Sequence, residues 1–244
     1  MTKLKVPSLQ HLARNWHPDS AKITKDLVRL AENPPIFNYN PLFSAVTDML
    51  LLGQPYDQIR KGIHKAVNRE GVRNNYLEIL PLLRGYVEGV NPDFVQKVDV
   101  RMYPVTRGFM IPFSPPLIYG VGGRVCFPWF SFWRASPLAD ERLSLFVTLV
   151  KEVLLDDPDL EDAKFEILDF SAPKPKAPRD LEIIDAKDVP ILSNNDKQNM
   201  LSVFAEGFFK AQAELAAKGH PTTSEEQSDR SVDSDQHDLF DPGQ

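Results

Sequence analysis

The stretch RVCFPWFSFWR at residues 124–134 places five aromatic side chains within seven positions. They fall on both sides of an extended chain, with Phe127, Trp129 and Trp133 on one side and Phe130 and Phe132 on the other. A strand that is apolar on both faces is normally covered on both. The stretch therefore predicts a central strand buried between two layers. An alternative is that the rings, beside Arg124 and Arg134, stack on exposed nucleic-acid bases.

The residues around this stretch favour a sheet with accompanying helices. From 94 to 134 the chain is rich in Val, Ile, Phe, Tyr and Trp, and Gly122 and Gly123 suit the turn of a hairpin. Two more strands are predicted at 163–170 and 181–186, joined by a basic, proline-rich loop. A long helix is predicted at 136–157, with Ser136 as its N-cap and Pro137 at its first position. A second long helix is predicted at 195–219.

Residues 1–90 show helical spacing of apolar residues and no strand pattern. Helices are predicted at 21–32, 41–52, 55–69 and 74–89, and Pro81 is expected to kink or split the last of these. The region therefore holds four or five short helices. Together with the sheet that follows, it predicts the α+β class, with a mixed or antiparallel sheet and two long helices.

Three regions follow from this pattern: a helical region at 1–90, a sheet-containing region at 91–219 and a tail at 220–244. Burial of the aromatic strand favours packing of the first two regions as one domain. The tail holds few large apolar side chains, so it is predicted to be disordered.

Charge is concentrated in the tail. Of the net charge of −6, residues 218–244 contribute −5, from seven acids and two bases, which leaves −1 for residues 1–217. The acidic balance therefore does not argue against a basic patch on the body.

A single cysteine, Cys126, rules out an intramolecular disulfide and fits a reducing compartment. No segment has the length of a signal peptide core or a membrane span, so a cytoplasmic protein without a membrane partner is expected.

Near its end the tail reads QHDLF, residues 236–240, where an apolar pair stands in an otherwise acidic segment. These residues resemble the pentapeptide through which bacterial DNA polymerases and repair proteins dock on the replicative sliding clamp, the beta subunit of the replicative polymerase. The constrained positions of that motif match Gln236, Asp238, Leu239 and Phe240. The resemblance implies that Leu239 and Phe240 fill a hydrophobic cleft and that the Gln236 amide bonds at its edge. Asp238 is implied to hold the turn or contact the rim. The alternatives are a chance match and a different partner.

The predicted helix at 55–69 has two unlike faces. Ile59, Ile63, Ala66 and Val67 form its apolar stripe. The opposite side and the residues just beyond carry Arg60, Lys61, His64, Lys65, Arg69 and Arg73. A ridge of this kind binds nucleic-acid phosphates, although a solvated helix face has the same composition.

Two acids and a lysine at the ends of neighbouring predicted strands suggest an enzymatic alternative. Asp169 ends one predicted strand, and Asp185 and Lys187 end the next. This resembles the acid…(Asp/Glu)-x-Lys signature of the PD-(D/E)XK nuclease superfamily, which implies two carboxylates on Mg²⁺ and a lysine that assists the attack of water. The sequence departs from that pattern because residue 168 is Leu and not Pro. The proline-rich loop, which carries Lys174, Lys176 and Arg179, is also poorly suited to holding the two acids together.

The sequence thus supports three functional hypotheses. The first is an accessory protein of bacterial DNA replication or repair that docks on the sliding clamp and contacts DNA through its body. The second is a Mg²⁺-dependent nuclease, and the third is a non-enzymatic adaptor unrelated to DNA. Only the second implies a cofactor.

Overall fold

The computed structural model describes residues 4–35 and 37–218. Its architecture is α+β, as the sequence predicts, with helices first and a mixed sheet after them. The helices are α1 (Leu9–Asn15), α2 (Ser20–Glu32), α3 (Asn40–Leu50), α4 (Tyr56–Ala66), α5 (Glu70–Gly89), α6 (Asp140–Leu155) and α7 (Asn194–Ala217), with a 3-10 turn η1 (Ala186–Asp188). The strands are β1 (Phe94–Gln96), β2 (Arg101–Thr106), β3 (Phe109–Phe113), β4 (Ile118–Val121), β5 (Arg124–Ser131), β6 (Lys164–Asp169) and β7 (Glu182–Asp185).

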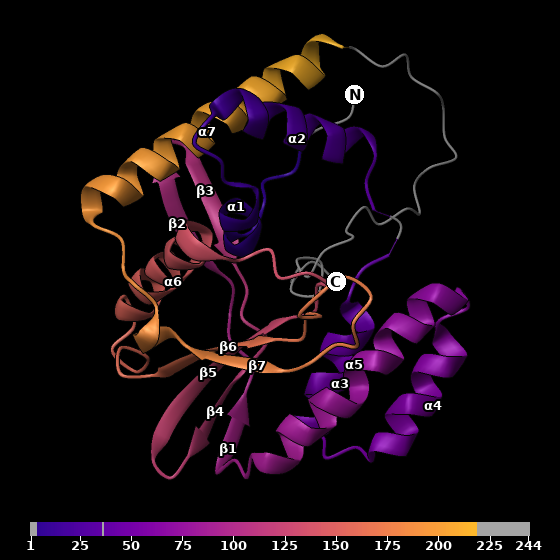
Figure 1. Cartoon of the computed structure of the whole chain (residues 1–244). Helices are drawn as coiled ribbons and strands as arrows, with labels where there is room; N and C mark the ends of the chain where they lie inside the picture. Colours follow the sequence, from indigo (N-terminus) through magenta and orange to yellow (C-terminus); the bar gives the residue numbers. More distant parts are fainter. Residues whose placement is uncertain (1–3, 36, 219–244) are drawn as a thin grey trace.

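Five strands form one mixed sheet in the order β1-β4-β5-β6-β7 (Figure 1). Neighbouring strands run antiparallel, except that β5 and β6 are parallel. Parallel neighbours need a long crossover, and α6 lies on that connection. Strands β2 and β3 pair with each other in a separate antiparallel ribbon.

Strand β5 is central and buried, which confirms the interpretation of the aromatic stretch. Phe127 and Trp129 face a first core that also contains Phe146 of α6. Phe130 faces a second core on the other side of the sheet. Trp133 differs from the prediction. The strand ends at Ser131, so Trp133 lies beyond the alternation and packs in the second core instead of beside Trp129.

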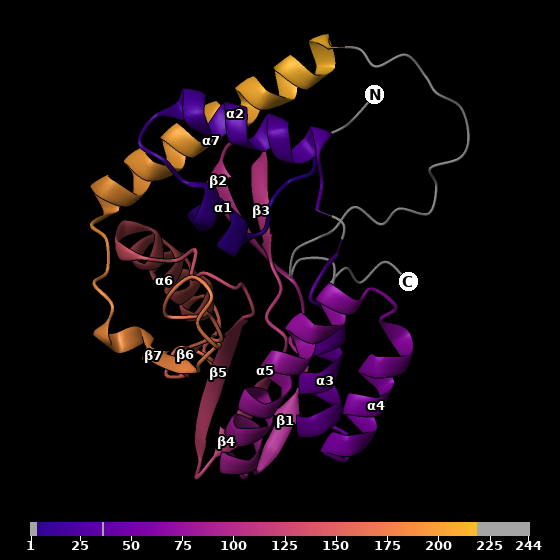
Figure 2. The same ribbon diagram turned by 45° about the vertical axis from the view of Figure 1, so that its right-hand side comes forward.

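Two layers of helices cover the sheet. Helices α3, α4 and α5 pack over the second core, while α6 and α1 cover the first (Figures 1 and 2). Helices α2 and α7 lie side by side above the β2–β3 ribbon and extend the first core. The helical region 1–90 is therefore divided between the two faces of the sheet.

The connection between β4 and β5 is the predicted hairpin turn. Val121 pairs with Arg124, which leaves Gly122 and Gly123 as a two-residue loop with φ of 56° and 76°. Positive φ at both positions matches the right-handed twist of the strands and favours glycine.

Two helices differ from the prediction in detail. Helix α6 begins at Asp140, because the buried Leu138 keeps the preceding residues extended and the Ser136 hydroxyl donates to the Leu138 carbonyl, 3.2 Å away, instead of capping the helix. Helix α5 is not split at Pro81. The proline lies on its exposed side, while Leu80 and Leu83 hold the helix against the second core.

Among the described residues, no helix combines the length and the apolar character needed to cross a membrane.

Candidate functional site

Helix α4 presents its basic residues to solvent. Ile59 and Ile63 are buried against the second core and fix the orientation of the helix. Ala66, which was expected in the apolar stripe, is exposed because the helix ends there. The exposed side chains opposite the buried pair are Arg60, Lys61, His64 and Lys65, and we call them the basic face.

None of the four residues of the basic face forms an ion pair within the described part of the chain, although Asp57 lies one turn before Lys61 on the same helix. One pair of these residues, Lys61 with Lys65, stands one helical turn apart. Like charges at this spacing destabilise a helix by about 0.2–0.5 kcal/mol per pair. The C-terminal end of the helix dipole offsets part of this, because Lys65 lies in the last turn. The arrangement suits a polyanion.

Arg69 and Arg73, the other two residues of the predicted ridge, have different environments. Arg69 is exposed at the start of α5 and lies close in sequence to the basic face. Arg73 is half-buried and donates from Nη1 to the carbonyls of Val67 and Asn68, at 3.0 and 3.4 Å. These bonds hold the α4–α5 connection, so Arg73 has a structural role in addition to its charge.

The structure does not bring Asp169 and Asp185 together. In the antiparallel β6–β7 pair, Asp169 lies opposite Glu182, and Asp185 lies opposite Glu166. Asp169 and Glu166 are three residues apart on β6, so the two aspartates are separated by about 10 Å along the strands and point to opposite faces of the sheet. They cannot share a cation, which removes the geometry that the nuclease resemblance implied.

Each of these residues has a local partner. Asp169 is buried, and its carboxylate accepts from the Ser171 amide at 3.1 Å and the Ser171 hydroxyl at 3.2 Å. Asp185 caps the turn η1 and pairs with Lys187, with 3.0 Å between the carboxylate and Nζ. Although burial acts to raise the pKa of Asp185, the backbone and side-chain hydrogen bonds from Lys187 hold it below its usual value.

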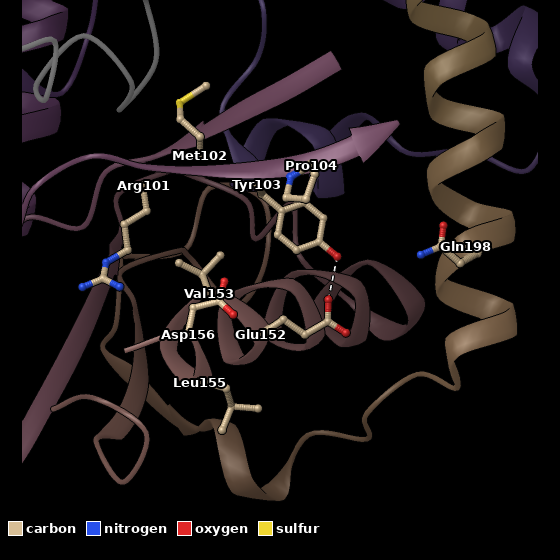
Figure 3. A pocket seen from close by; sticks show the side chains of 9 residues that line it. All are labelled: Arg101, Met102, Tyr103, Pro104, Glu152, Val153, Leu155, Asp156 and Gln198. Carbon is tan, nitrogen blue, oxygen red and sulfur yellow. Dashed lines mark hydrogen bonds between the residues drawn. The ribbon is translucent and has the colours of Figure 1, made fainter. Parts of the chain in front are cut away.

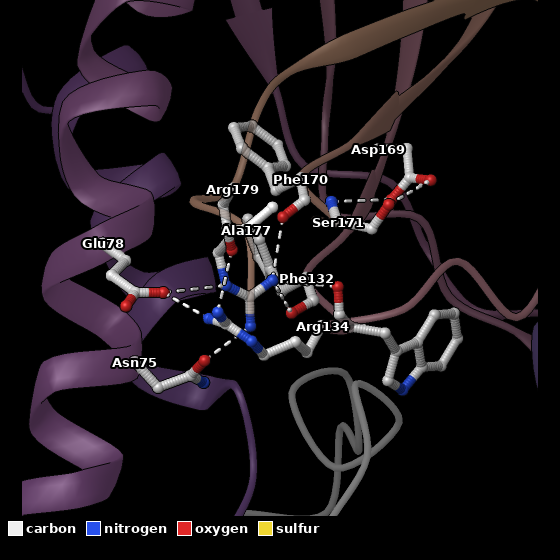
Figure 4. A network of polar contacts seen from close by, with 10 residues as sticks. Asn75, Glu78, Phe132, Arg134, Asp169, Phe170, Ser171, Ala177 and Arg179 are labelled. Carbon is white, nitrogen blue, oxygen red and sulfur yellow. Dashed lines mark hydrogen bonds and ion pairs between the residues drawn. The ribbon is translucent and has the colours of Figure 1, made fainter. Parts of the chain in front are cut away.

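The proline-rich loop does not line a catalytic cleft. Lys174 and Lys176 are exposed, but Arg179 is fully buried. Its Nη1 donates to the carbonyls of Phe132, Trp133 and Phe170, at 3.1, 2.9 and 2.8 Å (Figure 4). This guanidinium fastens the loop to the ends of β5 and β6 and is not available to a phosphate.

The pairing of β6 with β7 creates a charged cluster that sequence reasoning missed. Glu166, opposite Asp185, is buried and forms an ion pair with Lys164. Beside it, where β5 and β6 begin, lies a cleft of about 740 Å³ whose charged lining includes Arg124, Lys151 and Lys187. Only the register of β6 and β7 reveals this grouping. No group of three or more His, Cys, Asp or Glu that could hold a metal occurs among the described residues.

A second, shallower groove of about 670 Å³ runs between β2, α6 and the start of α7 (Figure 3). Within it the Tyr103 hydroxyl donates to Glu152 at 2.6 Å, and the same carboxylate accepts from Lys197 at 2.5 Å. Burial and the bond to Glu152 raise the pKa of Tyr103. Because these groups form hydrogen bonds with one another, they connect β2, α6 and α7 and are not free to act as catalytic groups.

The clamp-motif residues Gln236, Asp238, Leu239 and Phe240 lie outside the described residues. A comparison with protein-family models and a search of curated proteins found no match to the chain. The candidate interfaces are therefore the basic face of α4 and the sequence motif of the tail.

Proposed function

We propose that this protein is a cytoplasmic accessory factor of bacterial DNA replication or repair. It docks on the sliding clamp through residues 236–240 and contacts DNA through the basic face of α4. The pentapeptide QHDLF carries the proposal, because all four constrained positions of the docking motif are matched. A short peptide binds a preformed cleft through a few apolar anchors, and Leu239 and Phe240 supply such anchors.

The position of the motif supports this function. The last helix ends at Ala217, and 17 residues separate Lys218 from Gln236. A chain of that length reaches at most about 60 Å when fully extended. A body tethered at this distance remains close to DNA that passes through the clamp, and tethering raises its local concentration.

The body contributes the DNA-binding half of the proposal. The four side chains of the basic face, with Arg69 nearby, are exposed on one helix and its neighbour. Such a surface binds the phosphate backbone without reading sequence, and its affinity falls as salt rises. A protein held on the clamp needs no more than this, because the clamp determines where it acts.

The direct test is a pull-down of purified clamp by the full-length protein. The wild type should retain the clamp, and the variant with Leu239→Ala and Phe240→Ala should lose it. The matched control is His237→Ala, because the motif places no constraint on that position, and it should bind as the wild type does. Equal retention by all three proteins would reject the clamp function and leave an adaptor with another partner.

A further inference from the structure

The β2–β3 ribbon is apolar on both of its faces. The inner face packs in the first core with five buried side chains, Tyr103, Val105, Phe109, Ile111 and Phe113. The outer face carries Met102 and Pro104 of β2 and Met110 and Pro112 of β3, which alternate with the buried residues. An antiparallel pair with one solvated face normally places polar side chains on that face. The outer face therefore has the composition of a covered surface.

The four outer residues form one compact patch. In the register of the ribbon, Met102 lies opposite Pro112 and Pro104 lies opposite Met110, so the Cβ atoms of each pair are about 4.5–5.5 Å apart. Met102 is 51% exposed and Met110 is 41% exposed. Figure 3 shows Met102 on the side of β2 that faces away from α6. Because the flexible methionine side chain adapts to the shape of a partner, the patch suits a protein surface.

Both strands of the ribbon contain a proline, and this restricts how a partner can bind. Pro104 in β2 and Pro112 in β3 have no backbone N–H to donate. Proline on an edge strand discourages the addition of a further strand. A partner is therefore expected to pack on the outer face and not to extend the ribbon by edge pairing.

The base of the ribbon, where β2 begins, is acidic. Asp99 is exposed two residues before β2, and the exposed Asp156 lines the same groove as Met102. Arg101 is already engaged in an ion pair with an acid of the α6–β6 connection. Even with the nearby Lys97, this end of the ribbon has a net negative charge.

The tip of the ribbon carries the opposite charge. Arg107 is exposed in the two-residue turn that joins β2 to β3. Neither Arg107 nor Asp99 forms an ion pair within the described part of the chain. When two ribbons pack face to face and antiparallel about a two-fold axis, the tip of one lies against the base of the other. Arg107 of each copy then approaches Asp99 of the other copy, so the surface is complementary to itself.

We propose that the outer face of the β2–β3 ribbon is a self-association surface, on which two copies of this chain pack their ribbons face to face and antiparallel. The methionines and prolines of one copy cover those of the other. The ribbon measures on the order of 20 Å by 10 Å, which is small beside the roughly 800 Å² that each partner buries in a stable interface. The dimer is therefore weak, and its dissociation constant should be on the order of 10–100 μM.

Sedimentation of the full-length protein tests the association. Between about 1 and 500 μM, the average mass of the wild type should rise from one chain towards two. Met110→Asp should weaken the dimer at least about tenfold, because the new charge is buried without a partner. The matched control is Leu52→Asp, which introduces the same charge at a residue that is 59% exposed beyond the end of α3, and it should associate as the wild type does. A wild type that stays monomeric throughout, or equal losses in the two variants, would overturn the proposal.

A charge exchange tests the antiparallel arrangement. At about 50 mM salt, where screening is modest, Arg107→Asp and Asp99→Arg should each weaken the dimer about fivefold, because each places like charges together at both ends. The variant with both substitutions reverses the pair and should regain the wild-type dissociation constant. A double variant that associates no better than the single variants would reject the proposed packing. Neither experiment contains clamp or DNA, so the outcome does not depend on the proposed function.

Discussion

At the scale of single residues, Arg179 is the most connected side chain of the proline-rich loop. Three backbone carbonyls accept from its Nη1, and Asn75 Oδ1 accepts from Nη2 at 2.5 Å. Replacing Arg179 with Leu leaves these buried acceptors without a donor, and we expect the free energy of unfolding to fall by about 3 kcal/mol. Urea denaturation measures the change. Lys176→Ala, an exposed substitution in the same loop, is the control and should change stability by less than about 0.5 kcal/mol. Similar values for the two variants would contradict the role given to Arg179.

A second residue-scale prediction concerns alkaline pH. The Tyr86 and Tyr119 hydroxyls lie 2.6 Å apart between α5 and β4. Burial raises the pKa of Tyr119 to about 12, from an ordinary value of 10.0. Between these values the unfolded chain loses the phenol proton and the folded protein keeps it, so stability falls as pH rises. We expect the fall in urea midpoint between about pH 8 and about pH 11 to be smaller in Tyr119→Phe than in the wild type. An equal or larger fall in the variant would show that Tyr119 titrates normally.

At the scale of secondary-structure elements, one substitution should have opposite effects in a turn and in a helix. Gly123 has a φ of 76° in the β4–β5 turn, whereas Gly62 lies within α4 with open space around its Cα. Gly123→Ala should lower the free energy of unfolding by about 1–2 kcal/mol, because a side chain is strained at positive φ. Gly62→Ala should raise it by about 0.5–1 kcal/mol. Thermal denaturation of both variants makes the comparison. Destabilisation by Gly62→Ala would mean that α4 is not the exposed, regular helix described above.

The element scale also shows what the sequence could and could not predict. The apolar residues on both faces of β5 predicted its central place, and the glycine pair predicted the hairpin turn. The pattern within a helix gives the extent of its buried face but not its partner, so the division of α1–α5 between two faces of the sheet could not be foreseen. The start of α6 was missed because burial of Leu138 outweighed the local capping signal of Ser136.

Polar side chains were harder to place than apolar ones. Whether Asp169 and Asp185 meet depends on the register of β6 and β7, and a shift of one residue reverses the face of every side chain. Arg179 looked like an exposed charge in a basic loop, yet two carbonyls just beyond the ends of β5 and β6 accept from it. They belong to Trp133, 46 residues away, and to Phe170, nine residues away. The basic face of α4 was easier to identify, because exposure of a charged helix face needs no distant partner.

At the scale of the whole molecule, the proposals describe a compact α+β body and a charged tail that carries a docking peptide. In the proposed function, the body supplies a basic surface and residues 236–240 supply the anchors for the clamp. The account therefore expects the clamp and DNA to act together. Adding clamp to the wild-type protein should increase its affinity for DNA, whereas adding clamp to the Leu239→Ala and Phe240→Ala variant should not.

The measurement that tests the central claim most directly is a calorimetric titration of the purified clamp with a peptide of residues 234–244. We expect a dissociation constant on the order of micromolar, because ordering a free tail consumes much of the contact free energy. Phe240→Ala in the peptide should cost about 2 kcal/mol, close to a thirtyfold loss of affinity. His237→Ala should bind like the wild-type peptide. A wild-type peptide that gives no heat of binding at any accessible concentration, or a Phe240→Ala peptide that binds equally well, would contradict the assignment of the tail as a clamp-docking segment.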